Sequence, residues 1–377
     1  MPNHDAGKSH VFFTDLRTDN DTNLLDKAEK LARKAGLYDI DLKDRLVALK
    51  LHLGEPGNLA FLRHNYAARI AKLVAARGGL PFVTDANTLY KGERADAVRH
   101  LIAAAGNGYA YSAVGCPVLI ADGLRGHDHR EIAIDGKHFK TAFIASGIAE
   151  ADVVISLNHV KGHVETAFGG AVKNVGMGSG SRNGKHHMHS ASTPRVKADH
   201  CVGCGECESH CAYAAIRLDA ARKAVIDRSR CVGCGQCVAA CNYGAVRISW
   251  DQGGQVLGER VAEYALAALR GKPHLHLNFV MDVSPHCDCE DHNDIPLVPN
   301  IGMLASRDPV AIDVASADLV TQAPIHPGSA LEEYRAQNDG RGLDKFATLF
   351  PHAKWRDTMA YAESIGLGRV DYELVRI

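Results

Sequence analysis

The sequence predicts an α/β domain with a mostly parallel sheet, helices on both faces of the sheet and a small cysteine-rich insert. Three observations support this prediction: short apolar runs alternate with helical patterns in the first half, eight of the eleven cysteines fall between positions 201 and 241, and the alternation resumes after them. Such alternation favours βαβ units and a parallel sheet covered by helices. We therefore expect one α/β domain in two parts, residues 1–194 and 251–377, around an insert at residues 195–250.

The elements of the first half follow from short apolar runs and helical patterns. Thr22 is a candidate cap for the first helix, and Gly36 can end that helix. The strands are expected at residues 10–13, 46–51, 80–84, 118–121 and 152–157. The helices are expected at residues 24–35, 66–77 and 94–105.

The character of the chain changes after this last strand. Residues 158–192 are rich in Gly, His, Lys and Ser and have little periodicity. This is typical of the loops at the carboxyl ends of strands, where α/β folds place ligands. After the insert, helices are expected at residues 256–269 and 310–319, with Pro309 in the first turn of the second, and a strand is expected at residues 274–282.

The composition and net charge of the chain indicate which partners and which cell compartment to expect. The chain has 46% hydrophobic and 23% charged residues and a net charge of -1, so its charge favours neither nucleic acid nor a membrane as a partner. The polar N-terminus lacks the apolar region of a signal peptide, and no uncharged apolar run reaches the roughly 18 residues of a spanning helix. We therefore expect a cytoplasmic protein, in which clustered cysteines indicate metal binding or catalysis rather than disulfides.

The insert is an internal repeat of one cysteine motif. The segment C-V-G-C-G-E-C at residues 201–207 recurs as C-V-G-C-G-Q-C at residues 231–237, and a fourth cysteine completes C-x₂-C-x₂-C-x₃-C in each half. Over its whole length the insert resembles bacterial two-cluster ferredoxins, which implies a small α+β module that binds two 4Fe-4S clusters. It departs from that family at Ala212 and Asn242, which follow the fourth cysteine where the family usually has proline.

The ligand sets follow from the spacing within each motif. Three close thiolates can enclose one face of a cluster, whereas the fourth cysteine cannot reach the same cluster comfortably and serves the other one in such ferredoxins. The expected ligands are Cys201, Cys204, Cys207 and Cys241 for one cluster, and Cys231, Cys234, Cys237 and Cys211 for the other. Zinc is the alternative, since C-x₂-C pairs also bind it, but a doubled four-cysteine run favours clusters.

In the host domain, polar side chains gather where predicted strands end. Lysines and histidines in such places suit an anionic substrate and the delivery of protons during its reduction. The candidate catalytic residues are Lys50, His52, Asp85, His159, Lys161, His163, Lys173, Cys287 and Cys289.

Two alternatives stay open among these candidates. Lys50 and His52 form either a proton-transfer pair or an ordinary strand end. Gly169 and Gly170 with Lys173 form either an anion site or an ordinary glycine-rich turn. The segment lacks the G-x-x-x-x-G-K-[ST] spacing, so a nucleotide P-loop is not expected.

Cys287 and Cys289 flank Asp288, which puts them too close together for the usual C-x-x-C redox motif. They can ligate a metal, form a strained disulfide or simply line a cavity. A second possible site for an additional metal consists of His186, His187 and His189, which otherwise belong to a solvated loop. The remaining cysteine, Cys116, looks structural.

Several of these segments together carry a wider resemblance. Nearly the whole chain looks like a family of uncharacterised iron–sulfur-centre proteins, a domain of unknown function in which a two-cluster ferredoxin is often inserted. The resemblance implies an α/β host domain and redox work, but it supplies no reaction. The segments that carry it are residues 50–55, 84–90, 159–163, 169–178, 282–289 and 306–313.

The function expected from these features is that of a two-part redox protein. The two clusters would pass electrons to the Lys/His-rich site for the reduction of a small anionic substrate, and a redox partner protein would donate or accept electrons. The alternatives are an electron carrier that docks to a separate enzyme and a metal-handling protein. We find no G-x-G-x-x-G at a strand–helix junction, so a directly bound dinucleotide is not expected.

Overall fold

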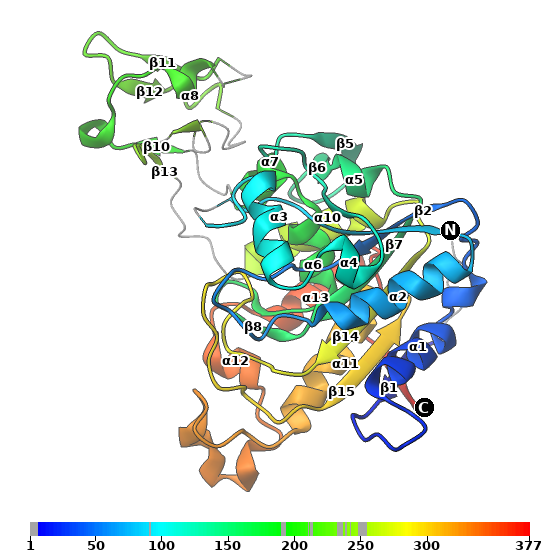
Figure 1. The fold of residues 1–377 in the computed structure, drawn as a ribbon. Coiled ribbons are helices and arrows are strands. Elements are labelled where there is room, and N and C mark those ends of the chain that lie inside the picture. Colours follow the sequence, from blue (N-terminus) through cyan, green and yellow to red (C-terminus); the bar gives the residue numbers. More distant parts are fainter. Residues whose placement is uncertain are drawn as a thin grey trace.

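A computed structural model of the chain describes residues 7–89, 92–189, 194–209, 211, 214–231, 237, 240–241, 243–247 and 255–377. In Figure 1 the central sheet and its helices form the main body, and the insert lies to one side at the upper left. No helix in these ranges is both long enough and apolar enough to cross a membrane.

The central sheet has eight strands in the order β16-β1-β15-β14-β7-β2-β3-β4. Only β15 runs against its neighbours, since it pairs antiparallel with both β1 and β14 while the other pairs are parallel. The predicted mostly parallel α/β sheet is therefore confirmed. The strands are β1 Ser9–Thr14, β2 Leu46–Lys50, β3 Leu80–Asp85, β4 Val118–Ile120, β7 Val153–His159, β14 His274–Val280, β15 Gly302–Ser306 and β16 Tyr372–Arg376.

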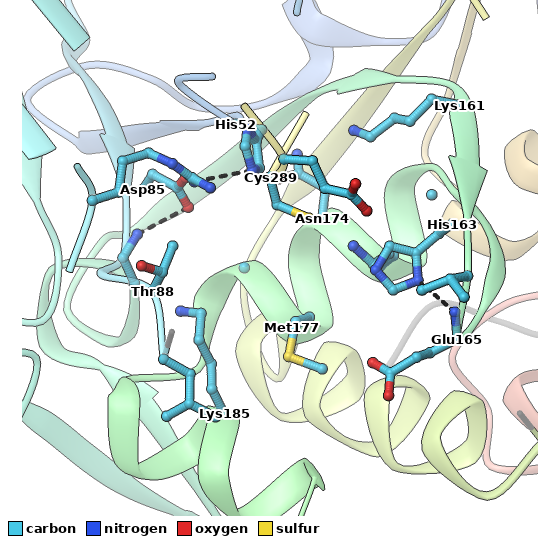
Figure 2. Close-up of a pocket in the computed structure, with 18 of the residues that line it drawn as sticks. His52, Asp85, Thr88, Lys161, His163, Glu165, Asn174, Met177, Lys185 and Cys289 are labelled. Carbon is cyan, nitrogen blue, oxygen red and sulfur yellow. Dashed lines mark hydrogen bonds and ion pairs between the residues drawn. The ribbon is translucent and has the colours of Figure 1, made fainter. Parts of the chain in front are cut away.

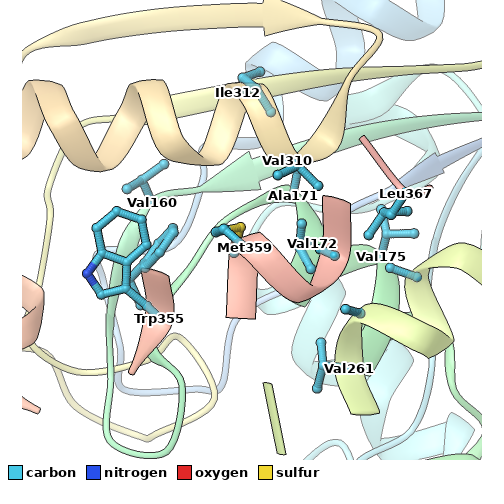
Figure 3. Packing of buried hydrophobic residues seen from close by; sticks show 14 of the residues in the cluster. Val160, Ala171, Val172, Val175, Val261, Val310, Ile312, Trp355, Met359 and Leu367 are labelled. Carbon is cyan, nitrogen blue, oxygen red and sulfur yellow. The ribbon is translucent and has the colours of Figure 1, made fainter. Parts of the chain in front are cut away.

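Helices cover both faces of the sheet, and each face has its own hydrophobic core. On one face, α1 (Leu24–Lys34) and α2 (His64–Ala76) pack on alternate residues of the central strands. On the other, four helices share a core that Figure 3 shows from close by, with Val172 and Trp355 among its members. These helices are α6 Ala171–Ser179, α10 Gln255–Leu269, α11 Pro309–Gln322 and α13 Trp355–Ser364.

The remaining elements of the host are short. They are α3 Ala97–Gly106, α4 Tyr111–Val114, α5 Ser146–Ala149, α7 Arg182–His189, α12 Lys345–Leu349, the antiparallel pair β5 His129–Ala133 and β6 Thr141–Ala145, and the pair β8 Lys161–His163 and β9 Ala167–Gly169.

Two expectations about local structure are corrected. The first helix is capped by Asn23 and not by Thr22: the Asn23 side chain accepts the amide protons of Leu25 and Asp26, which completes a capping box. Residues 158–192 are not mainly loop, because β8, β9, α6 and α7 lie within them. Pro309 occupies the first turn of α11, as expected, and Asp308 caps the helix.

The described residues of the insert include two short antiparallel pairs, one α-helix and a 3-10 helix at Ala198–His200. β10 (Arg195–Val196) pairs with β13 (Val246–Arg247), β11 (Ile216–Leu218) pairs with β12 (Ala224–Ile226), and α8 spans Glu206–Ser209. Because Arg195 lies opposite Arg247, the two ends of the insert meet. The host sheet takes strands from both sides of the insert, since β7 before it pairs with β14 after it.

Candidate functional site

A cavity of about 330 Å³ opens at the edge of the sheet where the parallel strands end. Lys50 ends β2, Asp85 ends β3 and His159 ends β7, and parallel strands bring such ends to one edge of a sheet. Figure 2 shows His52 and Asp85 on one side of this cavity, with His163 and Glu165 on the other. The charged, thiol and imidazole side chains that line it are His52, Asp85, Arg94, Lys161, His163, Glu165, Lys173, Lys185, His189, Cys289 and Glu290.

Lys50 lies behind the cavity wall in a fully buried ion pair. Its Nζ is 3.0 Å from Asp85 Oδ1 and donates to Asn174 Oδ1 at 2.7 Å. Burial alone would raise the pKa of Asp85, but the charge of Lys50 holds it well below its usual range. Gly178 leaves room for this arrangement, because a Cβ at that position would lie 2.4 Å from Lys50 Nζ.

Arg94 joins three of the groups around the cavity. Its Nε donates to Glu55 Oε2 at 2.7 Å, and its Nη1 lies 3.0 Å from His52 Nε2 and 3.8 Å from Asp85 Oδ2. Burial and the adjacent guanidinium hold the pKa of His52 well below its usual range, so the imidazole is neutral. Lys50 and His52 thus each contact a different partner, and no hydrogen bond joins them among the described contacts.

Asp288 is fully buried between two side chains of the β7–β8 segment. Its two oxygens lie 2.7 Å from His159 Nδ1 and 3.0 Å from Lys161 Nζ. Burial alone would raise the pKa of Asp288, but His159 and Lys161 hold it well below its usual range. The other ring nitrogen of His159 faces the Met281 carbonyl oxygen at 2.9 Å and therefore donates to it. His159 thus fixes the loop after β14 and is absent from the residues that line the cavity.

The two cysteines of that loop meet His163 of β8. One ligand atom from each of Cys287, Cys289 and His163 lies within 4.8 Å of the others. The hydrogen bond from Cys289 lowers the pKa of Cys287 well below its usual range against the effect of burial, and the Lys173 ammonium, 3.6 Å from Cys287 Sγ, adds to this. The same hydrogen bond and burial raise the pKa of Cys289, so the proton stays on Cys289.

A second group of this kind, formed by His286, Glu290 and His292, lies at the more exposed end of the same loop.

The three histidines of α7 do not meet at one point. His189 lines the cavity, whereas His187 Nδ1 lies 2.9 Å from the Tyr264 hydroxyl and its ring lies 4.0 Å from that of Phe139. His186 is buried, and burial lowers its pKa to about 3. The expected metal site of His186, His187 and His189 is therefore not formed.

Lys185, on the same helix, faces the cavity. Its Nζ donates to the Gly180 carbonyl oxygen at 2.6 Å, and burial lowers its pKa to about 8. The cavity therefore holds an ammonium group whose charge changes near neutral pH.

The first two amides of α6, which follow the glycine pair, are satisfied from within the protein. The amides of Ala171 and Val172 donate to the Asp313 carboxylate at 2.6 and 2.9 Å. These two amides are therefore not free to hold an anion at the start of the helix.

A line of buried hydrogen bonds joins Asp313 to Lys50 through three asparagines. Asn278 donates to Asp313 at 2.8 Å, Asn158 lies 2.9 Å from Asn278, and Asn174 joins Asn158 at 2.7 Å and Lys50 at 2.7 Å. This chain of amides ties the wall of the cavity to the start of α6.

Sequence reasoning missed the partners that hold the predicted residues in place. All of them except Arg94 lie in segments that carry the family resemblance, and Asp288 has a further signal in its position between two cysteines. The missed residues are Glu55, Arg94, Asn174, Asp288 and Asp313.

Four cysteines of the insert line one small cavity. They are Cys201, Cys204, Cys207 and Cys241, the set that the spacing assigns to one cluster. Backbone amides point at the sulfurs in the same register of both repeats, since Ala215 N donates to Cys211 Sγ at 3.2 Å and Ala245 N to Cys241 Sγ at 3.3 Å. In the second set, Cys211, Cys231 and Cys237 are described, whereas Cys234 lies outside the described residues.

Comparison with known proteins gives a family and two distant folds. A solved protein from Thermotoga maritima is 9% identical with a TM-score of 0.40, covering 82% of this chain and 61% of its own, so this chain spans less than two thirds of its length. The lactate racemase apoprotein from Thermoanaerobacterium thermosaccharolyticum is 11% identical with a TM-score of 0.39, covering 97% of this chain and 82% of its own. No curated protein matches.

The comparison with family models gives one match over a long segment of the sequence. A family described as a domain of unknown function (DUF362) matches residues 47–318, which include the cavity residues of both host segments and the insert. Since this match spans well over half of the chain, the protein belongs to the DUF362 family.

Proposed function

We propose that the protein is an iron–sulfur oxidoreductase whose insert holds two 4Fe-4S clusters and whose host cavity binds and reduces a small anionic substrate. The observation that carries this proposal is the convergence of two sets of residues. Four motif cysteines line one cavity in the insert, and three lysines and one thiol, from four host segments, meet in another. When bound, the clusters would supply single electrons.

The donor set of the insert suits a cluster. Cys201, Cys204, Cys207 and Cys241 provide four thiols around one space. Amide-to-sulfur hydrogen bonds of the kind made by Ala224 N to Cys201 Sγ, at 3.4 Å, stabilise the reduced state of such centres.

The host cavity offers positive charge to an anion. Lys173 and Lys185 enter it from α6 and α7, and Arg94 enters from the segment before α3. The carboxylates of Glu55 and Asp85 already face Arg94, so the two lysines are the groups best placed to bind an added anion. The Lys185 side chain is buried, which strengthens its interactions relative to water.

Burial of the side chains that line the cavity also distinguishes this proposal from the alternative of an electron carrier. A protein that only docks to a separate enzyme has no need for a cavity in which buried lysines, thiols and imidazoles converge. Among the described residues these groups face inward, because Lys185 is 8% and Lys161 is 5% exposed.

The test begins with the purified full-length chain under anaerobic conditions. We expect about eight iron and eight sulfide ions per chain, as two 4Fe-4S clusters require. The reduced protein is then mixed with small oxoanions and carboxylates, and re-oxidation of the clusters is followed by absorbance. Lys173→Met and Lys185→Met should each slow re-oxidation by the effective anion about tenfold, the effect of losing one charge-assisted hydrogen bond.

The matched control is Lys34→Met, which removes an exposed lysine of α1. It should re-oxidise at the wild-type rate. Zinc in place of iron would contradict the cluster assignment, and equal rates in all three variants would support the carrier alternative instead.

A further inference from the structure

Three potential metal ligands of the host domain meet beside the cavity. One ligand atom each from His163, Cys287 and Cys289 lies within 4.8 Å of the other two. His163 and Cys289 line the cavity, and Cys287 is buried behind them. None of these residues belongs to the eight cysteines of the insert.

We infer that His163, Cys287 and Cys289 bind one transition-metal ion and leave one coordination position open to the cavity. Tetrahedral bonds of about 2.3 Å to sulfur and about 2.0 Å to nitrogen place the ligand atoms about 3.5–3.8 Å apart. The present spacing therefore needs a movement of no more than about 1 Å. Three protein ligands with an open fourth position are the arrangement of catalytic metal sites, whereas structural sites use four.

Backbone contacts and the buried contacts of Asp288 hold in place the two segments that carry the ligands. Gly162 N donates to the Ser284 carbonyl oxygen at 2.8 Å, and a Cβ at Gly162 would lie 2.4 Å from the Pro285 carbonyl oxygen, so β8 and the cysteine loop touch through backbone. Asp288, between the two cysteines, is held by His159 and Lys161, and its carbonyl oxygen accepts the Glu55 amide at 2.9 Å. The thiols are therefore positioned before any ion arrives.

The surroundings compensate the charge and orient the imidazole. Lys173 Nζ lies 3.6 Å from Cys287 Sγ and offsets the negative charge of two thiolates. The backbone amides of Glu165 and Thr166 donate to His163 Nδ1 at 3.2 Å each, and the Thr166 hydroxyl oxygen lies 3.0 Å from the same nitrogen. These contacts fix the orientation of the His163 ring.

The ligand chemistry selects the metal class. Two thiolates and one imidazole suit Zn²⁺, Fe²⁺, Co²⁺ or Ni²⁺ and disfavour Mg²⁺ and Ca²⁺, which prefer oxygen ligands. The neighbouring group of His286, Glu290 and His292 is a weaker competitor, because its side chains are 38%, 39% and 56% exposed. The inference rests on host residues alone and stands apart from the proposed clusters.

Zinc is the probe for the test, because its X-ray absorption edge is separate from that of iron. Full-length protein with its iron centres in place is freed of loosely bound metal, given one equivalent of Zn²⁺ and passed over a desalting column. We expect one zinc per chain, with two sulfur atoms, one nitrogen atom and a further oxygen or nitrogen atom around it. This measurement needs no variant, and a shell of four sulfur atoms would overturn the proposal by placing zinc in the insert.

Variants then assign the ligands. Cys287→Ser, Cys289→Ser and His163→Gln should each weaken zinc binding by more than about 100-fold, since loss of a residue that only orients a ligand already costs 10–100-fold. Cys116→Ser and His292→Gln are the matched controls and should bind as wild type, because Cys116 is buried elsewhere and His292 belongs to the competing group. Circular dichroism checks that each variant is folded.

Three outcomes overturn the inference: a wild-type protein that retains no zinc, wild-type affinity in all three ligand variants, or a Cys287–Cys289 disulfide in the anaerobically purified chain. Iron and sulfide content, measured in the same samples, reports on the insert separately. A protein without clusters that still binds zinc through two sulfurs and one nitrogen would contradict the proposed function and leave this site standing.

Discussion

The insert and the host domain are stabilised in different ways. In the described part of the insert, the buried apolar cluster has seven members, and three of them are the cysteines Cys201, Cys207 and Cys237. The host has two large cores, one on each face of its sheet. A module with so small a core depends on what its cysteines bind, whereas the host can fold first and present its site ready-made.

Removal of the metal from the insert is the strongest way to test this difference. Cys207→Ser, or chelation of iron from the wild type, should abolish the fold of the insert, because binding at a structural metal site is worth about 10 kcal/mol or more to such small modules. The host should melt at an unchanged temperature. Limited proteolysis, read out by mass spectrometry, should show new cuts only within residues 195–250. An insert that stays protected without iron would contradict the comparison.

The second test breaks a contact inside the host. Asp288→Asn removes the carboxylate that faces His159 and leaves the Lys161 ammonium buried without it, and removing one partner of a buried ion pair costs about 3–5 kcal/mol. We expect the midpoint of urea unfolding of the host to fall, with iron content unchanged. Asp291→Asn, on the exposed end of the same loop, is the control and should leave the midpoint where it is. An equal effect of both changes would show that the loop is not clamped through Asp288.

A third test uses the titration of the cavity. Burial lowers the pKa of Lys185 to about 8. The ammonium is therefore fully charged well below pH 8 and loses its charge as the pH rises through about 8. Binding of sulfate, whose own charge is constant in this range, should weaken about tenfold across that step, the value of one charge-assisted hydrogen bond. Calorimetric titration measures it. Lys185→Arg should bind sulfate without the step, and a step that survives in Lys185→Arg would belong to another group.

The smallest expected effect concerns the surface of the host. Asn23→Ala removes the cap of α1 and should lower the free energy of unfolding by about 1 kcal/mol. Thr22→Ala, one residue earlier, should change it by less than about 0.5 kcal/mol. Both are measured by urea unfolding followed by circular dichroism. A larger loss of unfolding free energy in Thr22→Ala than in Asn23→Ala would show that Thr22 is the cap, as the sequence predicted.

The sheet was the part of the fold most open to prediction. All seven residues of β7 are buried, and this strand begins with the apolar run at residues 153–155, as β2 begins with the apolar run at residues 46–49. The helices α6 and α7 were missed because their inward faces carry Lys173, Asn174, Lys185 and His189 around a cavity. An apolar stripe, which is what periodicity detects, is therefore weak in α6 and absent in α7.

The site was predicted in part for a related reason. Residues at strand ends must gather at one edge of a parallel sheet, so Asp85, Lys161 and Cys289 could be placed near the cavity from sequence alone. Their partners could not, because contacts such as that of Arg94 with Glu55, or of Asp288 with His159, join segments that no local pattern relates. His159 and Lys50 lie near the cavity, as predicted, but they are not among the residues that line it.

The lack of a side chain at Gly178 limits the substitutions that members of the family can carry at this position. A side chain at this position would push Lys50 away from Asp85, so the glycine can be replaced only where the lysine has been replaced too. Relatives that carry alanine or serine at position 178 should therefore also have replaced the lysine of β2. An alignment in which a side chain at position 178 stands beside an unchanged lysine would mean that Lys50 reaches its carboxylate by another path in those proteins.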